Sequence, residues 1–288
     1  MDSKKVVIVG AGPAGIATAL QLKRSSIDAV LVEQNEIGGL LRNANFVENY
    51  PGFPEGIKGL ELVELFKKHL KIRDVDIHFE RVLELELKNE RFFTKTNLRK
   101  ITSKIAVIAS GTKPKKPSVP FISKDVEDRI FYEVYPILKV KNQEIAIIGA
   151  GDAAFDYALS LSQNNSVFIL NRSSRIKSIP ALFEKCKKSN NILYREHINI
   201  KEIRREGSKL LLTCSPHQIK VDYAIFAVGR EPYLDFLGDG VIKQFEHLIK
   251  TDALFIIGDA KNEIYRQAAI CIGDGIKTAM KIHKKLRK

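Results

Sequence analysis

A glycine-rich stretch near the N-terminus, residues 10–15, constrains the fold of this chain more than any other feature. It follows four apolar residues, Val6–Val9, that predict a buried parallel strand. Gly10, Gly12 and Gly15 have the G-x-G-x-x-G spacing that opens a dinucleotide-binding βαβ unit. The first glycine permits a tight turn, the second lets the backbone approach a pyrophosphate, and the third lets the next helix pack closely. The phosphates then bind at the N-terminus of that helix, whose dipole and N–H groups favour negative charge.

An acidic residue supports this interpretation over a glycine turn that binds nothing. Glu33 ends a second predicted strand, Ala29–Val32, about where a carboxylate meets the 2′-hydroxyl of a ribose. A free 2′-hydroxyl is what the adenosine half of FAD carries, so we expect the first turn to bind FAD. The turn residues expected at this cofactor are Gly10, Gly12, Pro13, Ala14 and Gly15.

The same pattern returns in the middle of the chain. The apolar run Ile145–Ile148 leads into Gly149 and Gly151, with Ala154 in the third position, and a second strand follows at 167–170. This second strand ends without a carboxylate, in a basic segment. Arginine at this place suits a 2′-phosphate, which favours NADP over NAD, and the alternative is that the cations only face solvent. The residues expected at the second nucleotide are Gly149, Gly151, Asp152, Ala153, Arg172, Arg175 and Lys177.

The remaining patterns give the domain organisation. An amphipathic helix over 59–70, a strand meander over 83–101 and a buried strand over 105–112 follow the first turn, and a second meander over 198–213 follows the second. The last buried strand, 253–257, has no glycine-rich turn of its own, so we expect it to return to the first sheet. The predicted fold class is α/β, with two Rossmann-like, three-layer ββα domains. The FAD-binding domain is discontinuous, residues 1–114 and 232–288, and the NAD(P)H-binding domain comprises residues 115–231.

Composition narrows the class of protein further. No apolar run approaches the roughly eighteen residues that span a bilayer, so we expect no membrane span. Three cysteines without C-x-x-C spacing argue against a disulfide framework or a zinc site and fit a reducing cytoplasm. The net charge of +13 is typical of a solvated lysine-rich surface, or could steer an acidic electron-transfer partner. No basic helix is interleaved with aromatic residues, so we expect no nucleic-acid binding.

When its motifs are taken together in chain order, the chain resembles the low-molecular-weight thioredoxin reductase family over essentially its whole length. The matching segments are 10–15, Gly38–Gly39, Glu48–Phe53, Gly149–Ala154, Gly258–Asp259 and Arg266–Ala268. The resemblance implies FAD in the discontinuous domain, a homodimer, and rotation of the nicotinamide domain to alternate what faces the flavin. It implies that Asp259 bonds the ribityl and pyrophosphate region, and that Asn49, Arg266, Gln267 and Ala268 line the flavin. The other FAD contacts that we predict are Gly39, Leu40, Val82, Ala109 and Gly111.

One departure from that family bears directly on function. Its redox-active C-x-x-C lies just upstream of the second glycine-rich strand, where this chain has Tyr132-Glu133-Val134-Tyr135. Disulfide reduction by the usual relay needs an attacking thiolate and a resolving thiol, and neither tyrosine supplies one. Either Tyr132 or Tyr135 could stack on the flavin, or both could pack at a domain interface. Of the cysteines, Cys186 is predicted in a helix, Cys214 in the meander, and Cys271 as a buried inert thiol in the last helix.

The sequence therefore predicts an FAD-dependent NAD(P)H oxidoreductase with no certain catalytic side chain. Hydride would pass from NADPH, with NADH as the alternative donor, to the flavin. The electrons would leave to ferredoxin, flavodoxin, a quinone or another small acceptor, since thioredoxin-reductase-like ferredoxin-NADP reductases also lack the cysteine pair. Two alternatives are disulfide reduction through non-standard cysteines and a non-catalytic flavin redox sensor. A sensor needs no second nucleotide site, which argues against the latter.

Overall fold

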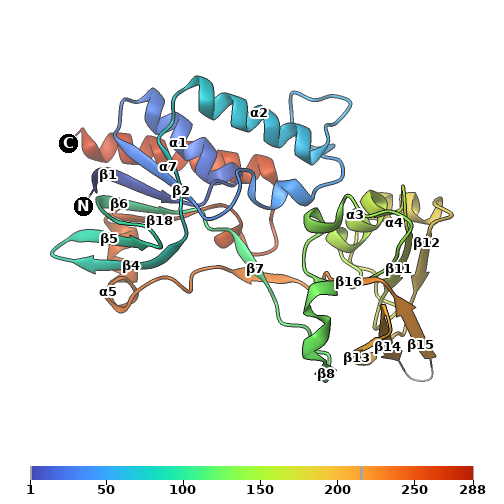
Figure 1. Cartoon of the computed structure of the whole chain (residues 1–288). Coiled ribbons are helices and arrows are strands. Elements are labelled where there is room, and N and C mark those ends of the chain that lie inside the picture. Colours follow the sequence, from blue (N-terminus) through green and yellow to red (C-terminus); the bar gives the residue numbers. More distant parts are fainter. Residues whose placement is uncertain (1, 215–216, 288) are drawn as a thin grey trace. The chain divides into compact units, whose positions relative to one another are not determined.

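The structure is a computed structural model that describes residues 2–214 and 217–287, and its residues form two compact units (Figure 1). Unit 1 comprises the chain up to Arg42, Val47–Lys113 and the chain from Glu231 onward; unit 2 comprises Asn43–Phe46 and Pro114–Arg230. The predicted boundaries at 114/115 and 231/232 each differ from these by one residue. The prediction also placed 43–46 in the first domain, whereas their hydrogen bonds tie them to unit 2.

Unit 1 is built on a seven-stranded sheet in the order β3-β2-β1-β6-β5-β4, with β18 also paired to β6. Its strands are β1 (Asp2–Val9), β2 (Ala29–Glu33), β3 (Ile77–Phe79), β4 (Val82–Lys88), β5 (Arg91–Thr96), β6 (Lys100–Ile108) and β18 (Leu254–Ile256). Its helices are α1 (Pro13–Arg24), α2 (Gly59–Ile72), α5 (Asp239–Lys243), α6 (Phe245–Lys250) and α7 (Ala268–Leu286), with short 3₁₀ turns η1 (Gly39–Asn43, whose last residue belongs to unit 2) and η4 (Gly258–Ala260).

Strand β6 changes partners along its length, so that it belongs both to the antiparallel β4–β5 layer and to the parallel layer of unit 1. Residues Lys100–Ser103 pair with β5 in antiparallel register, while Ala106–Ile108 pair with β18 in parallel register. The predicted return of the last strand to the first sheet is thereby confirmed. The hairpin of β4 and β5 covers one face of the parallel strands, and α1, α2 and α7 lie on the other (Figure 1).

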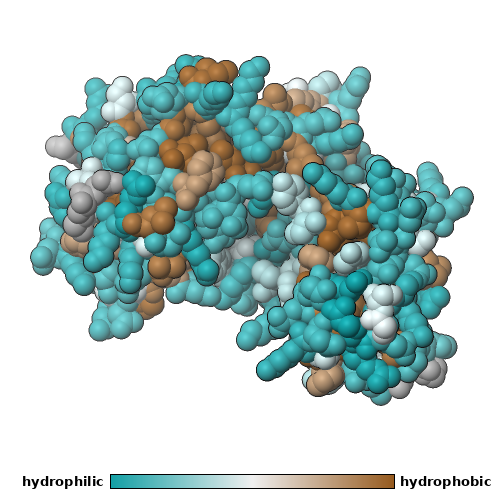
Figure 2. Space-filling model, in the orientation of Figure 1, coloured by the Kyte–Doolittle hydropathy of each residue, from teal (hydrophilic) through white to brown (hydrophobic). Residues whose placement is uncertain are grey.

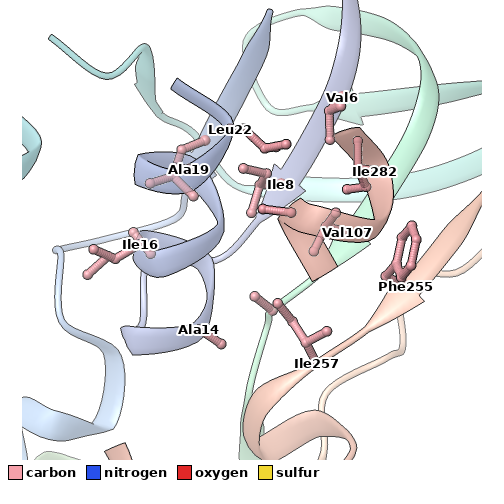
Figure 3. Packing of buried hydrophobic residues seen from close by; sticks show 14 of the residues in the cluster. Val6, Ile8, Ala14, Ile16, Ala19, Leu22, Val107, Phe255, Ile257 and Ile282 are labelled. Atoms are coloured by element: carbon pink, nitrogen blue, oxygen red, sulfur yellow. The ribbon is translucent and has the colours of Figure 1, made fainter. Parts of the chain in front are cut away.

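The core of unit 1 lies between the parallel strands and the helices α1 and α7 (Figure 3). Small residues bring the two helices together, because a Cβ on Gly275 of α7 would lie only 2.4 Å from the carbonyl oxygen of Ala14. The apolar face of α1 is buried against the strands, and the glycine-rich turn at 10–12 connects the end of β1 to the start of that helix at Pro13. Side chains labelled in this core are Val6, Ile8, Ala14, Ile16, Ala19, Leu22, Val107, Phe255, Ile257 and Ile282.

Unit 2 repeats the same three layers. A parallel sheet in the order β12-β11-β10-β16-β9 packs against α3 and α4 on one face and against a second sheet, β15-β14-β13-β8, on the other. The parallel strands are β9 (Ile130–Phe131), β10 (Glu144–Ile148), β11 (Ser166–Leu170), β12 (Ile192–Arg195) and β16 (Tyr223–Phe226). The second sheet comprises β8 (Phe121–Ile122), β13 (Ile200–Glu206), β14 (Lys209–Cys214) and β15 (His217–Val221). The helices are α3 (Asp152–Leu161) and α4 (Pro180–Lys187), with 3₁₀ turns η2 (Lys124–Arg129) and η3 (Tyr135–Ile137).

The predicted α/β class with two three-layer ββα units is therefore confirmed. The chain passes between the units at β7 (Thr112–Pro114) and β17 (Arg230–Pro232), which pair as a two-stranded sheet. Hydrophilic side chains cover most of the visible face of each unit (Figure 2). Within residues 2–214 and 217–287, no helix is both long and apolar enough to cross a membrane.

Candidate functional site

The first glycine-rich turn has the geometry of a phosphate cradle. Gly10 has φ +103°, and a Cβ there would lie 2.4 Å from the carbonyl oxygen of Ala109, so only glycine fits. A Cβ on Gly12 would meet nothing within 4 Å, which leaves open space beside the N-terminus of α1. That helix begins at Pro13 without a side-chain cap, so its first N–H groups are available to a ligand. Gly39 lies against Gly12, since its Cβ would be 3.2 Å from the Gly12 Cα.

Glu33 is tied to this turn by hydrogen bonds. Its side chain is buried, with 8% of the residue exposed. Oε2 accepts from the backbone N–H of Ala11 at 2.7 Å, and Oε1 accepts from the N–H of Asn35 at 3.0 Å. Each carboxylate oxygen has a second lone pair, so these bonds orient Glu33 and leave it able to accept from a ribose hydroxyl. The carboxylate predicted for ribose binding thus also supports the backbone of the turn.

Other residues predicted at FAD gather near this turn from distant parts of the sequence. Asp259 lies in η4, beside the first turn of α1, because a Cβ on the preceding Gly258 would be 2.8 Å from the Ala14 Cβ. Asn49 donates from Nδ2 to Oε1 of Gln267 at 3.0 Å, where Gln267 is the N-cap residue of α7. These contacts join four matched segments of the family resemblance in two pairs within unit 1, 258–259 with 10–15 and 48–53 with 266–268.

The remaining residues predicted at FAD come from several elements of unit 1. Ala109 follows β6 and donates its N–H to the carbonyl of Val9 at 2.8 Å, next to the turn. Val82 begins β4 and is buried in the core on the face of the sheet opposite α1, with Ala106 and Ile108. Leu40 lies in η1, Gly111 follows β6 with φ +67°, Arg266 and Ala268 flank the start of α7, and Pro13 and Gly15 belong to α1.

The second turn, in unit 2, has the same backbone as the first. Gly10 donates to Val32 at 2.8 Å, and Gly149 donates correspondingly to Leu170 at 3.0 Å. Asn171 therefore occupies the place that Glu33 has in unit 1. Gly151, like Gly12, has no atom within 4 Å of the position of a Cβ, and α3 begins without a side-chain cap. The first residues of α3, Asp152 and Ala153, are exposed beside this open space.

A basic loop, residues 172–179, is held against the second turn by hydrogen bonds from its backbone N–H groups. Lys177 donates its N–H to the carbonyl of Ala150 at 2.8 Å, and the N–H of Ile179 donates to Oδ1 of Asp152 at 2.8 Å. The side chain of Asn171, 5% exposed, donates from Nδ2 to the carbonyl of Arg175 at 3.1 Å. The basic side chains are all exposed, and within the described residues none is paired with a carboxylate: Arg172, Arg175 and Lys177.

Asn171 has a structural role that sequence reasoning missed. Besides Arg175, its amide donates to the hydroxyl of Tyr194 at 2.9 Å, and its Oδ1 accepts from the N–H of Ser173. A buried polar residue directly after an apolar strand was the available signal, because a buried amide must find several partners. Asn171 thereby shapes the loop that presents the three cations.

The segment that replaces C-x-x-C is held within unit 2. Tyr132 stacks on Phe226, with ring centroids 5.9 Å apart and an interplanar angle of 29°. Glu133 pairs with Arg230 at 3.1 Å and accepts from Nδ2 of Asn43 at 3.2 Å. The N–H of Tyr135 donates to Oδ1 of Asn43 at 3.0 Å. Tyr132 thus has an aromatic partner of its own in unit 2.

Comparison with known proteins agrees with this geometry. Residues 4–275 match the sequence profile described as pyridine nucleotide-disulphide oxidoreductase. The chain belongs to this family. Similar sequences include the thioredoxin reductase of Mycoplasma genitalium, 28% identical over 96% of this chain and 93% of that protein, and that of Chlamydia trachomatis, 26% identical over 97% of both.

Solved structures give the same result at the level of the fold. The thioredoxin reductase of T. acidophilum matches with a TM-score of 0.87 at 25% identity and covers 100% of both chains. That of Lactococcus lactis matches with a TM-score of 0.86 at 24% identity, over 99% of both chains. A bacillithiol disulfide reductase from Staphylococcus aureus has a TM-score of 0.75 at 16% identity, over 99% of both.

This pyridine nucleotide-disulphide oxidoreductase is a flavoprotein enzyme of the thioredoxin reductase type, and its family uses FAD and NADPH. The open space at Gly12 and Gly151, beside uncapped helix N-termini, fits two dinucleotides, one in each unit. Gly10–Gly15 with Glu33 would hold FAD, and Gly149–Ala153 with the basic loop would hold NADPH.

The cysteines of this family member are buried thiols in three separate cores. Cys186 lies in α4, Cys214 in β14 and Cys271 in α7, as predicted. They belong to different hydrophobic clusters, so they form no pair. Burial raises the pKa of Cys186 to about 11, with a smaller contribution from Asp156, and burial also raises the pKa of Cys214 and Cys271. Thiolate, the reactive form, is scarce in all three near neutral pH.

Proposed function

We propose that this chain is an FAD-dependent NAD(P)H oxidoreductase whose electron acceptor is not a thioredoxin-type disulfide. The observation that carries the proposal is the state of the cysteines. The sequence contains no C-x-x-C, and the three thiols are buried in separate cores with raised pKa values. A thiol relay needs two cysteines that can reach one another and one thiolate that can attack. Both requirements are unmet, while both nucleotide cradles are intact.

The side chains of this chain would act by binding and orientation. Glu33 orients the first turn and accepts from the ribose of the adenosine half of FAD, and the first N–H groups of α1 bind its pyrophosphate. Bound FAD supplies the chemistry, which is uptake of a hydride from reduced nicotinamide and release of its electrons to an acceptor. No general acid or base is required of the protein for that transfer.

The basic loop supports NADPH as the donor, with NADH as the weaker alternative. Arg172, Arg175 and Lys177 are exposed and free of carboxylate partners within the described ranges. A 2′-phosphate carries negative charge that such cations can bind through charge-assisted hydrogen bonds. Asn171, in the place of Glu33, adds no repulsive carboxylate beside that phosphate.

A redox protein is the partner class that the relatives support, since those matched are thioredoxin reductases. An acidic ferredoxin or flavodoxin fits the net charge of +13, because opposite charge speeds association at low ionic strength. We further propose a homodimer located in the cytoplasm, on the family resemblance and on cysteine usage respectively.

The decisive experiment measures separately the reduction of the flavin by a nicotinamide nucleotide and its reoxidation by an electron acceptor. The purified yellow protein is mixed anaerobically with NADPH and then NADH, and bleaching of the flavin absorbance is followed. We expect rapid bleaching that is faster with NADPH. Reduced protein is then offered oxidised thioredoxin, ferredoxin, flavodoxin and a soluble quinone in parallel. Steady turnover with thioredoxin would refute the proposed acceptor class, and persistent yellow colour with both nucleotides would refute the enzyme.

The tyrosines at the C-x-x-C positions provide a further test. Tyr132 already stacks on Phe226, so Tyr135 is the better candidate to contact the flavin. We expect Tyr135→Ala to change flavin fluorescence and Tyr132→Ala to leave it unchanged. Unchanged fluorescence in both variants would exclude stacking by either ring.

A further inference from the structure

The first turns of α7 hold the loop that carries Asp259. Cys271 donates its thiol hydrogen to Oδ1 of Asp259, with Sγ and Oδ1 3.2 Å apart. Asp274, three residues later on the same helix face, accepts at Oδ2 from the backbone N–H of Gly258 at 3.1 Å and from Nδ2 of Asn262 at 2.7 Å. The two α7 side chains therefore hold the side chain of Asp259, the backbone N–H of the preceding Gly258 and the side chain of Asn262 in the same loop.

The same loop is locked to the beginning of α1. Gly258 has φ +65°, and a Cβ there would lie 2.8 Å from the Ala14 Cβ, so the loop lies directly on the first turn of α1. Gly275, the residue after Asp274, brings α7 equally close to α1, and its carbonyl accepts from Oγ1 of Thr18 at 3.3 Å. The position of Asp259 relative to the glycine-rich turn is consequently set by α7.

The chemistry of the two side chains suits this positioning role. A carboxylate such as Asp274 costs free energy when it is removed from water, and its two N–H donors offset that cost. Burial, together with Asp259 and Asp274, raises the pKa of the Cys271 thiol. The thiol therefore stays protonated near neutral pH and remains a hydrogen-bond donor to Asp259.

We propose that Cys271 and Asp274 are positioning residues for FAD binding, because they orient the Asp259 carboxylate toward the cofactor. This inference rests on the proposed role of Asp259 at FAD. Neither residue was singled out for this role from the sequence, since their partners lie in a separate segment that only the fold brings beside α7.

The test is titration of the full-length apoprotein with FAD, followed by quenching of flavin fluorescence. Hydrogen bonds of this kind change affinity about three- to tenfold. We expect Asp274→Ala to weaken FAD binding about tenfold and Cys271→Ala about threefold, while Cys271→Ser, which keeps a donor, restores most of the affinity. The matched control is Cys186→Ala, the same change in a buried thiol of unit 2, which should leave FAD affinity unchanged.

A double-mutant cycle separates positioning from mere packing. In an Asp259→Ala background, Cys271→Ala should weaken FAD binding less than twofold, because there is no carboxylate left to orient. Undiminished effects in that background, or wild-type affinity in both single variants, would overturn the inference. If the Asp274 variants do not fold, Asn262→Ala removes one of its bonds at a partly exposed residue and should weaken binding about threefold; wild-type affinity in that variant would also overturn it.

Failure of the proposed function gives a different result. If the wild-type protein binds no FAD, or if Asp259→Ala alone leaves affinity unchanged, the role of Asp259 is wrong and the inference falls with it. If Asp259→Ala weakens binding and only the α7 variants are neutral, the proposed function stands and the inference alone is refuted.

Discussion

The two glycine-rich turns have the same backbone but are held in place by different chemistry. In unit 1 the carboxylate of Glu33 accepts from the N–H of Ala11 inside the turn. In unit 2 the side chain of the corresponding residue, Asn171, bonds to Arg175 and organises a basic loop, which then bonds back to the turn through Lys177 and Ile179. The residue at the end of the second apolar run thus supports the turn directly in unit 1 and through a loop in unit 2.

The third position of the motif shows a second difference. A Cβ on Gly15 would lie 1.9 Å from the carbonyl oxygen of Gly10, whereas unit 2 accommodates the fully buried methyl group of Ala154. The helix of unit 1 therefore packs closer to its turn than the helix of unit 2 does. Three predictions use these differences and a fourth concerns the buried thiols, in order of decreasing effect.

The largest effect is expected for Gly15→Ala. The added methyl group must displace backbone, so we expect a loss of more than about 4 kcal/mol in the free energy of unfolding, or failure of unit 1 to fold. The reciprocal change, Ala154→Gly, should cost only about 1–2 kcal/mol through helix propensity and lost burial. Denaturant unfolding monitored by circular dichroism measures both. Equal losses in the two variants would contradict the difference in helix packing.

The next effect tests whether Glu33 supports the turn as well as the cofactor. Glu33→Ala leaves the N–H groups of Ala11 and Asn35 without their acceptor, so the apoprotein should lose about 2–3 kcal/mol of stability. Glu33→Gln keeps one acceptor oxygen, enough for only one of the two N–H donors, and should lose about half as much, about 1–2 kcal/mol. Thermal unfolding without FAD compares them. If both apoproteins are as stable as the wild type, Glu33 acts on the cofactor alone.

A smaller effect is expected on nucleotide choice. Arg172→Ala should raise the KM for NADPH about tenfold, equivalent to roughly 1.4 kcal/mol, and the KM for NADH less than twofold. The matched control is Lys187→Ala, an exposed cation on α4 that pairs with Glu184. Steady-state kinetics at constant ionic strength provides the measurement. A parallel rise for both nucleotides would mean that the loop does not recognise a 2′-phosphate.

The smallest effect concerns the reactivity of the buried thiols, which should be low in both units. Burial raises the pKa of Cys186 to about 11, which lowers its thiolate fraction about a hundredfold relative to an exposed thiol at the same pH. We expect negligible labelling of the native protein by iodoacetamide at pH 8, with reaction of Cys186 rising only as the pH approaches 11. Turnover of Cys186→Ser and Cys214→Ser should equal that of the wild type. Fast labelling at pH 8 accompanied by loss of turnover would point to thiol catalysis.

Much of this organisation could be predicted from the sequence because it is encoded locally. Apolar runs ending in spaced glycines predict a strand, a turn and a helix without reference to the rest of the chain. Glu33 and Arg172 are then found within two residues of the end of the apolar run of the next strand. The repeat of the pattern predicted the fold class, and the absence of C-x-x-C spacing led to the hypothesis of an acceptor other than a thioredoxin-type disulfide.

Only the tertiary structure decided how distant segments support these turns. Three sets of contacts join segments that no local pattern relates. Cys271 and Asp274 bond to the loop of Asp259, and Asn49 bonds to Gln267. Asn43 bonds to Glu133 and Tyr135. The physical reason is that glycine spacing reflects backbone conformation over a few residues, whereas hydrogen-bond partners depend on packing between elements that are distant in the chain.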